Sequence, residues 1–234
     1  MPCSARSRRC SAARCCSASS SGVGRRPADG RRAHRRPDRL PRAADRLKHV
    51  ERRGRTRRPD GGDRAENSAE HCWNVALVAV LMHSEVPDPP DLGHVLAMIA
   101  AHDLVEVEAG DTFAYDEAHL LTQAGRERAA ADVVFGALPP DLGGRLRALW
   151  EEFEEGVTPA ARFAMACDRA QGFLQGVIGT GHWRDAGIGE ARTLGRMEPA
   201  RAAAPAFRAL IDELYARARQ GGMFAPDGRG SGTA

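Results

Sequence analysis

The stretch AAHDLVEVEAGD, residues 100–111, places a histidine and several acidic residues directly after an apolar run. His102 is followed by Asp103, and Glu106 and Asp111 come next along the chain. On a helix, residues three and four positions apart are neighbours, so Glu106 would share a face with His102 and Asp103. Imidazole nitrogens and carboxylate oxygens are ligands that divalent cations bind in proteins. The stretch therefore indicates a metal site.

Two further residues of these types lie in other segments with helical patterns. His71 lies near the start of the preceding segment, and a short PDPPD connection between two antiparallel helices would bring it close to His102. Asp168 lies among apolar residues of a later segment, where a buried carboxylate needs a partner. That partner is either a bound cation or one of the nearby arginines, Arg162 or Arg169.

Together these residues offer two imidazoles and two carboxylates, from His71, His102, Asp103 and Asp168. Such a set suits Mn, Co, Fe or Zn better than Mg or Ca, which prefer oxygen ligands alone. We expect one divalent cation, because only His119 lies between the His-Asp pair and Asp168 as a ligand for a second. A cation there would lower the pKa of a bound water and neutralise phosphoryl charge, while nearby carboxylates transfer protons. Taken alone, the His102-Asp103 pair also fits a solvated helix end, and His71 fits an ordinary helix start, so the prediction depends on the combined order of these residues.

The segments that carry these residues are predicted to be helices. Ser68, Asp91 and Thr158 are expected as N-caps, and Gly110 is expected to end the segment with the His-Asp pair. Alternating strand patterns and hairpin turns are nearly absent. The sequence therefore predicts an all-α fold. The expected helical segments span residues 66–86, 91–110, 117–138, 144–156, 158–178 and 205–220.

Composition and cysteine usage limit the class of protein. The chain has 234 residues, 42% of them hydrophobic and 28% charged, which is typical of a soluble globular domain. Its longest apolar run, Val75 to Met82, is far shorter than the roughly 20 residues of a membrane span. The six cysteines form no CxxC pair, so we expect a reducing, cytoplasmic setting without disulfides. Cys72 and Cys167, each next to a predicted ligand, are expected to face away as small core residues.

The charge is distributed unevenly along the chain. Residues 1–60 hold 19 of the 34 basic residues and 5 of the 31 acidic ones, so the remainder of the protein is acidic. Residues 1–44 are rich in arginine and serine and lack apolar periodicity, which predicts a disordered extension. This composition overlaps with that of organelle transit peptides and of arms that bind nucleic acid. Nucleic acid is expected as a partner only through this extension.

Three segments, ENSAEHCWNVALVAVL, AAHDLVEVEAGDTFAYD and TPAARFAMACDRAQ, strongly resemble the HD-domain superfamily of metal-dependent phosphohydrolases. More narrowly, they resemble the branch that contains bacterial 5′-deoxynucleotidases. The resemblance implies an HD-domain helical bundle over residues 45–222, with the metal held by the four ligands named above. Residues 223–234 are expected to form a flexible glycine-rich tail.

The resemblance also implies roles for three further residues. Glu106 and Asp111 match catalytic positions, with Asp111 as general acid or base and Glu106 orienting the water or the substrate. Arg52, shortly after the RLK tripeptide, matches the position that binds the 5′-phosphate. The implied reaction is hydrolysis of a nucleoside 5′-monophosphate to a nucleoside and phosphate, with a homodimer as the implied assembly.

Alternatives to this reaction stay open. They are hydrolysis of another phosphorylated metabolite or of a pyrophosphorylated nucleotide, and a module that binds metal or nucleotide without turnover. Two departures from the family pattern concern the start of the domain. Prolines in RPDRLPRAA, residues 36–44, are expected to disrupt the N-terminal helix, and the stretch TRRPDGGDRA, residues 56–65, is longer than in the characterised nucleotidases.

Overall fold

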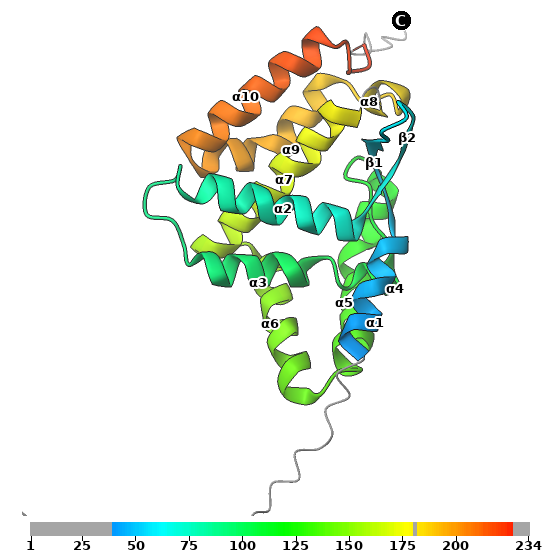
Figure 1. Ribbon diagram of the computed structural model, residues 1–234, viewed down its shortest axis with the longest axis vertical. Coiled ribbons are helices and arrows are strands. Elements are labelled where there is room, and N and C mark those ends of the chain that lie inside the picture. The colour runs from blue at the N-terminus through cyan, green and yellow to red at the C-terminus, as the bar shows by residue number, and fades with distance from the viewer. Residues whose placement is uncertain (1–38, 180–181, 227–234) are drawn as a thin grey trace, which may run out of the picture. The chain divides into compact units, whose positions relative to one another are not determined.

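The structure is a computed structural model, and it describes residues 39–179 and 182–226. Helices make up most of this part of the chain (Figure 1). The all-α prediction is confirmed, with one small two-stranded sheet added. Most of the predicted extension and most of the predicted tail lie outside the described residues. None of the described helices is both long and apolar enough to span a membrane. The elements are α1 Arg39–Arg46, the 3-10 turn η1 Leu47–His49, β1 Glu51–Arg57, β2 Asp63–Asn67, α2 Ser68–His83, α3 Leu92–His102, α4 Glu106–Ala109, α5 Glu117–Gly136, α6 Pro140–Glu155, α7 Pro159–Gly179, α8 His182–Asp185, α9 Glu190–Ala203 and α10 Pro205–Gln220.

Two of the three predicted N-caps are confirmed. The side chains of Asp91 and Thr158 each accept a hydrogen bond from a backbone N–H in the first turn of α3 and α7. The prediction of Ser68 as a cap is wrong, because Asn67 caps α2 and Glu70 completes a capping box. The side chain of Ser68 is therefore available for another partner, which lies in the candidate site.

The segment with the His-Asp pair forms two helices rather than one. α3 ends at His102, and α4 begins at Glu106. The N–H of Glu106 bonds to the carbonyl of Asp103 at 3.0 Å, so the turn between the helices stays tight. Gly110, with a φ of 74°, ends α4 as predicted.

A β-hairpin, which the sequence patterns did not predict, joins η1 to α2. β1 pairs antiparallel with β2, with Thr56 opposite Arg64 and Arg57 opposite Asp63. Gly61 has a φ of 86° in the connecting turn, a conformation that glycine adopts without strain. The expectation that hairpin turns are nearly absent is therefore wrong at this point. The stretch at residues 56–65 forms the tip of this hairpin.

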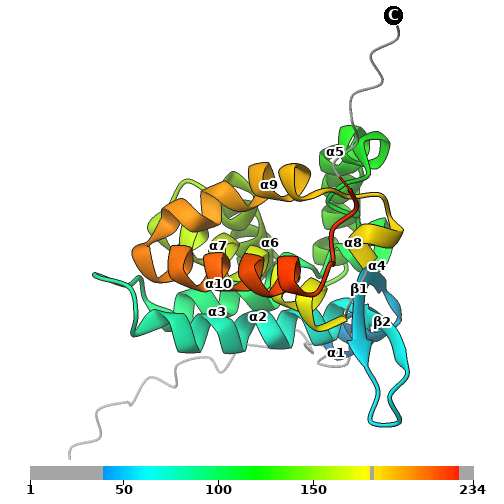
Figure 2. The same cartoon turned by 90° about the horizontal axis from the view of Figure 1, so that it is seen from above.

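β1 packs closely against α7, and this contact places Arg52 beside the core helices. Gly179, at the end of α7, permits the approach, because a Cβ there would lie 2.3 Å from the carbonyl oxygen of Arg55. The side-chain amide of Gln175 donates a hydrogen bond to the same oxygen at 2.7 Å. Figure 2 shows the hairpin at one side of the helices, next to α1.

α1 forms despite Pro41, so the prediction that prolines disrupt this helix is wrong over Arg39–Arg46, whereas Pro37 lies outside the described residues. Pro41 lies in the first turn of the helix, where backbone N–H groups have no partner within the helix. At the other end, Arg46 donates a hydrogen bond to the carbonyl of Val107 at 2.8 Å and pairs with Glu108. These contacts attach α1 to α4.

α7 lies among the other long helices, with α2, α3, α6, α9 and α10 packed around it and β1 beside it (Figures 1 and 2). The larger core surrounds α7, and its fully buried members include Val75, Ile99, Phe207, Ile211 and Tyr215. A smaller core between α3, α5 and α6 includes Ala101, Leu104, Phe135 and Trp150. Each large apolar side chain buried in this way stabilises the fold by roughly 1.5–3 kcal/mol. The helices that carry the predicted ligands are therefore fixed by the core itself.

Candidate active site

His71 and Asp168 meet between α2 and α7. His71 lies in the first turn of α2 and is 1% exposed, and its Nε2 lies 2.9 Å from Oδ1 of Asp168. Its other ring nitrogen, Nδ1, lies 2.6 Å from the side-chain oxygen of Gln171. An amide oxygen only accepts hydrogen bonds, so Nδ1 carries the proton and the lone pair of Nε2 faces the carboxylate.

His102, at the end of α3, points its Nε2 toward the carboxylates beside His71. Its Nδ1 donates a hydrogen bond to the carbonyl of Ile99 at 2.7 Å, which again leaves a lone pair on Nε2. That Nε2 is buried and has no hydrogen-bond partner among the described residues, although it lies 3.1 Å from Oδ1 of Asp103. Oδ2 of Asp103 lies 3.8 Å from Nε2 of His71.

These four side chains fit a divalent cation. Ligand atoms of His71, His102 and Asp168 lie within 4.8 Å of one another, and Asp103 borders both histidines. Two imidazole lone pairs that face carboxylate oxygens, one of them without any hydrogen bond, are unfavourable unless a positive charge lies between them. The structure thus brings together the four residues that the sequence predicted as ligands.

The pKa values of these side chains also indicate a site with too many lone pairs and negative charges for its size. Burial, together with the nearby Arg52, lowers the pKa of His71 to about 4, so its imidazole is neutral at pH 7. Burial raises the pKa of Asp103 to about 8 against the effect of Arg52, and the carboxylates of Asp168 and Asp111 raise it further. Burial would raise the pKa of Asp168 as well, but His71 and His102, when they are protonated, and Arg52 together lower it. A bound cation would relieve the repulsion among these carboxylates.

Arg52 extends from β1 into the middle of the acidic residues. Its Nη1 lies 3.2 Å from Oδ2 of Asp103, 3.5 Å from Oε1 of Glu106 and 3.1 Å from Oδ1 of Asp111. Glu106 is 8% exposed and also accepts a hydrogen bond from Oγ of Ser68, the residue displaced from the cap position. Burial and the carboxylate of Asp103 raise the pKa of Glu106 well above its usual value. The residues with predicted catalytic and phosphate-binding roles therefore lie together, directly beside the ligands.

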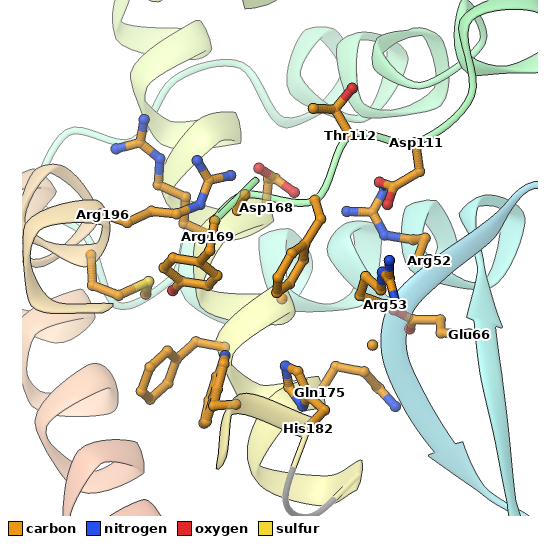
Figure 3. A pocket seen from close by; sticks show the side chains of 18 residues that line it. Arg52, Arg53, Glu66, Asp111, Thr112, Asp168, Arg169, Gln175, His182 and Arg196 are labelled. Carbon is orange, nitrogen blue, oxygen red and sulfur yellow. Dashed lines mark ion pairs between the residues drawn. The ribbon is translucent and has the colours of Figure 1, made fainter. Parts of the chain in front are cut away.

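A pocket opens next to this cluster. Arg52, Arg53 and Asp111 line one part of it and Asp168 lies between them and two further arginines, Arg169 and Arg196 (Figure 3). Its wall is partly aromatic, with contributions from Phe113, Tyr115, Phe173 and Trp183. A pocket with charged groups at both ends and aromatic rings along its wall can hold a small phosphorylated molecule.

Comparison with known proteins identifies the family. The model of a family described as "HD domain" matches residues 44–208. The chain belongs to the HD domain family. The resemblance noted in the three sequence segments is thereby confirmed.

Curated relatives of this HD domain protein include 5′-deoxynucleotidases. The human and mouse proteins named 5′-deoxynucleotidase HDDC2 are 28% and 27% identical to it, over 112 and 113 residues. Each match covers 48% of this chain, and 53% and 55% of the two relatives. The chain therefore spans about half the length of the curated relatives it matches.

Solved structures share the HD domain architecture. A crystal structure from Magnetospirillum magnetotacticum MS-1, described as that of a "predicted metal-dependent phosphohydrolase", has 38% sequence identity and a TM-score of 0.64. The match covers 78% of this chain and 91% of that one. A conserved hypothetical protein from Pyrococcus furiosus, with 20% identity and a TM-score of 0.52, covers 75% of this chain and 98% of its own and shares the fold alone.

Sequence patterns missed several residues around the HD domain site. Gln171, which contacts His71, lies one helical turn after Asp168 on α7, and this spacing is a signal that could have revealed it. Arg169 and Arg196 come together only through the packing of α7 and α9, which no local pattern shows.

Cys72 departs from its expected orientation in the HD domain. Its Sγ lies 3.7 Å from Oδ2 of Asp103 and 3.9 Å from Nδ1 of His102, so it faces the cluster rather than turning away. Burial and the charge of Asp103 raise the pKa of this thiol, so it stays protonated at neutral pH. Cys167, in contrast, is fully buried in the larger core, as expected.

Proposed function

We propose that this chain is a metal-dependent phosphohydrolase that converts a nucleoside 5′-monophosphate to a nucleoside and phosphate. The position of Arg52 carries the proposal, because its guanidinium reaches both Asp103 and Asp111 beside a pocket. A phosphate-binding group, candidate metal ligands and a proton-transfer group thus converge. The 5′-deoxynucleotidase names of the curated relatives and the phosphohydrolase description of the Magnetospirillum structure support this reaction class.

His71, His102, Asp103 and Asp168 would hold one divalent cation in this proposal. When bound, the cation would neutralise charge on the phosphoryl group and make a water molecule more acidic. The mixed nitrogen and oxygen donors favour Mn, Co, Fe or Zn over Mg.

The remaining residues bind the phosphate and transfer protons. Arg52 offers a planar fork of N–H donors that suits two phosphate oxygens, and a phosphate would replace its present carboxylate contacts. As water bonds to phosphorus and the ester P–O bond breaks, one proton must leave the water and one must reach the leaving oxygen. Asp111, whose side chain is 11% exposed and lines the pocket, would carry such a proton. Glu106, held by Ser68, would orient the water or the substrate.

Phosphate release from a panel of ribo- and deoxynucleoside 5′-monophosphates tests the proposal. Each reaction would contain Mn, Co, Mg or Zn, and wild type would be compared with Asp103→Ala, Glu106→Ala and the control Glu213→Ala. Glu213 is an exposed acid of α10 that pairs with Arg217. We expect metal-dependent release that the first two substitutions abolish and the control preserves.

The same panel separates the alternatives. Release only from sugar phosphates or from nucleoside triphosphates would contradict the monophosphate assignment and favour one of the other phosphoester classes. Stoichiometric metal binding without release from any substrate would contradict hydrolysis and favour a non-catalytic module. The homodimer implied by resemblance stays a prediction, which sedimentation at micromolar concentration checks.

A further inference from the structure

Two arginines line the pocket on the side of Asp168 away from Arg52. Arg169 follows Asp168 directly on α7, and Arg196 extends from α9 (Figure 3). Arg52, Arg53 and Asp111 occupy the other side of Asp168 in the same pocket. The pocket therefore carries positive charge at two separate places.

Neither Arg169 nor Arg196 has a hydrogen bond or an ion pair to any residue in the described part of the chain. Arg192, one helical turn before Arg196, shows the usual arrangement, because it pairs with Glu117 and bonds to the carbonyl of Tyr115. Arg169 is half-buried, and Arg196 lies beside it on the same side of the pocket (Figure 3). Asp168 is a negative charge beside Arg169 but forms no ion pair with it in the described part of the chain, so keeping two like charges together here is unfavourable, more so where one of them is partly buried.

We propose that Arg169 and Arg196 form a subsite for a second anionic group of the substrate, separate from the phosphate that is hydrolysed. The inference rests on the proposed function, since it assigns the hydrolysed phosphate to the Arg52 side. A phosphate or a carboxylate would satisfy two guanidinium groups by charge-assisted hydrogen bonds. The substrate class is thus a nucleoside 5′-monophosphate that carries a further phosphate or carboxylate.

The wall of the pocket is suited to the uncharged part of such a substrate. Phe113 and Tyr115 meet edge to face, with ring centroids 5.4 Å apart, and both line the pocket with the arginines. Tyr115 lies near Arg196: burial raises the pKa of its hydroxyl, while the positive charge of Arg196 opposes that shift. Aromatic faces can contact a base or sugar placed between the two positive ends.

Three related pyrimidine ribonucleotides test the subsite: uridine 5′-monophosphate, uridine 3′,5′-bisphosphate and orotidine 5′-monophosphate. The second differs from the first by a phosphate, and the third differs by a carboxylate on the base. Values of kcat/KM would be measured for wild type, Arg169→Gln, Arg196→Gln and the control Arg208→Gln, an exposed arginine of α10 outside the pocket lining. We expect wild type to favour at least one doubly anionic ligand by about tenfold or more. The ratio of kcat/KM for the doubly anionic ligand to kcat/KM for uridine 5′-monophosphate would move toward one in Arg169→Gln and in Arg196→Gln. It would stay unchanged in Arg208→Gln.

Calorimetry measures the affinity of the same ligands for protein stripped of metal with EDTA. The ratio of affinities for the doubly anionic ligand and for uridine 5′-monophosphate is a second readout, which needs no turnover. If no ligand releases phosphate but the binding ratio is high in wild type and lost in Arg196→Gln, the subsite stands and the proposed function fails. A binding ratio near one in wild type would overturn the subsite, even if uridine 5′-monophosphate is hydrolysed. So would a high ratio that both substitutions leave unchanged. Thermal unfolding of each variant identifies any that fails to fold, and Arg196→Gln, at an exposed position, is the variant on which the decision depends.

Discussion

The side-chain amide of Gln171 donates a hydrogen bond to Glu66, with Nε2 3.1 Å from Oε1. Both side chains are almost completely buried, at 1% and 2% exposure, and Asn74 donates to the same carboxylate oxygen. Because the amide nitrogen faces Glu66, the amide oxygen must face Nδ1 of His71. Glu66 thus determines, through Gln171, which nitrogen of His71 is available to a metal.

Gln171→Leu is expected to weaken metal binding by about 10- to 100-fold, because it removes the acceptor that holds the proton on Nδ1 of His71. Affinity would be measured by competition with a fluorescent chelator, using Mn or Zn. Gln123→Leu, which removes an amide bonded to Glu127 on α5, serves as the matched control. Equal affinities for the two variants would contradict the orienting role of Gln171.

Gly179→Ala is expected to move β1 away from α7, since the added Cβ would meet the carbonyl oxygen of Arg55 at 2.3 Å. Overpacking of this kind costs about 1–3 kcal/mol of stability. The shift would also displace Arg52, three residues before Arg55 on the same strand, and so raise KM for a phosphoester. Urea unfolding and steady-state kinetics measure the two effects.

Gly125→Ala is the comparison for that substitution. Gly125 lies inside α5, where no described atom outside its own stretch of helix backbone lies within 4 Å of an added Cβ, so alanine should stabilise the helix by roughly 0.5–1 kcal/mol. If Gly179→Ala were as stable as Gly125→Ala and kept its KM, the close contact between β1 and α7 would not position Arg52.

The sequence could point to the four predicted metal ligands because each belongs to a local pattern, and the structure brings these four residues together. His71 lies in the first turn of a helix, His102 and Asp103 end another, and Asp168 stands out as an acid among apolar residues. Helical spacing and the need to pair a buried carboxylate were enough to connect them. Their assembly then follows from packing α2, α3 and α7 around one core.

The hairpin could not be predicted in the same way. Its strands, ERRGRTR and DRAEN, have no alternating apolar residues, because β1 is held by backbone and side-chain contacts to α7 rather than by an apolar face. Arg52 was therefore assigned from resemblance alone, as one arginine among many. Its contact with Asp111 depends on the docking of β1, which is a tertiary relationship.

Arg52→Gln is expected to raise KM for phosphate release by about 10- to 100-fold, because neutral glutamine cannot form the charge-assisted pair with a phosphate. Arg52→Lys keeps the charge without the planar fork and should give an intermediate KM. Steady-state kinetics, with inorganic phosphate as a competitive inhibitor, measure both effects. Arg58→Gln, at an exposed position in the hairpin turn, should leave KM unchanged. An unaltered KM in Arg52→Gln would exclude Arg52 as the phosphate-binding residue.

His182 is expected to make the fold sensitive to acid. Burial lowers its pKa to about 4, with Asp185 opposing this shift and Arg55 adding to it, and its buried Nδ1 has no hydrogen-bond partner among the described residues. A histidine in the unfolded chain has a pKa near 6.5, so between these two values the unfolded state binds the proton more readily. The stability that neutral His182 contributes at pH 7 is therefore lost as pH falls from about 6.5 to about 4. After allowance for partial exposure, the loss is about 2 kcal/mol.

The effect is measured as the difference between parent and His182→Gln in the free energy of unfolding, by urea titration in EDTA at pH 7 and at pH 4.5. The slope is the change in the free energy of unfolding between pH 7 and pH 4.5. Other groups titrate in this range in both proteins, so only the difference between the slopes of parent and variant reports on His182. We expect a shallower loss of stability on acidification in His182→Gln. His119→Gln, at an exposed position of α5, should keep the slope of the parent. Parallel slopes for the parent and His182→Gln would show that His182 is protonated as readily in the folded chain as in the unfolded one, and its ring would then have to be open to water.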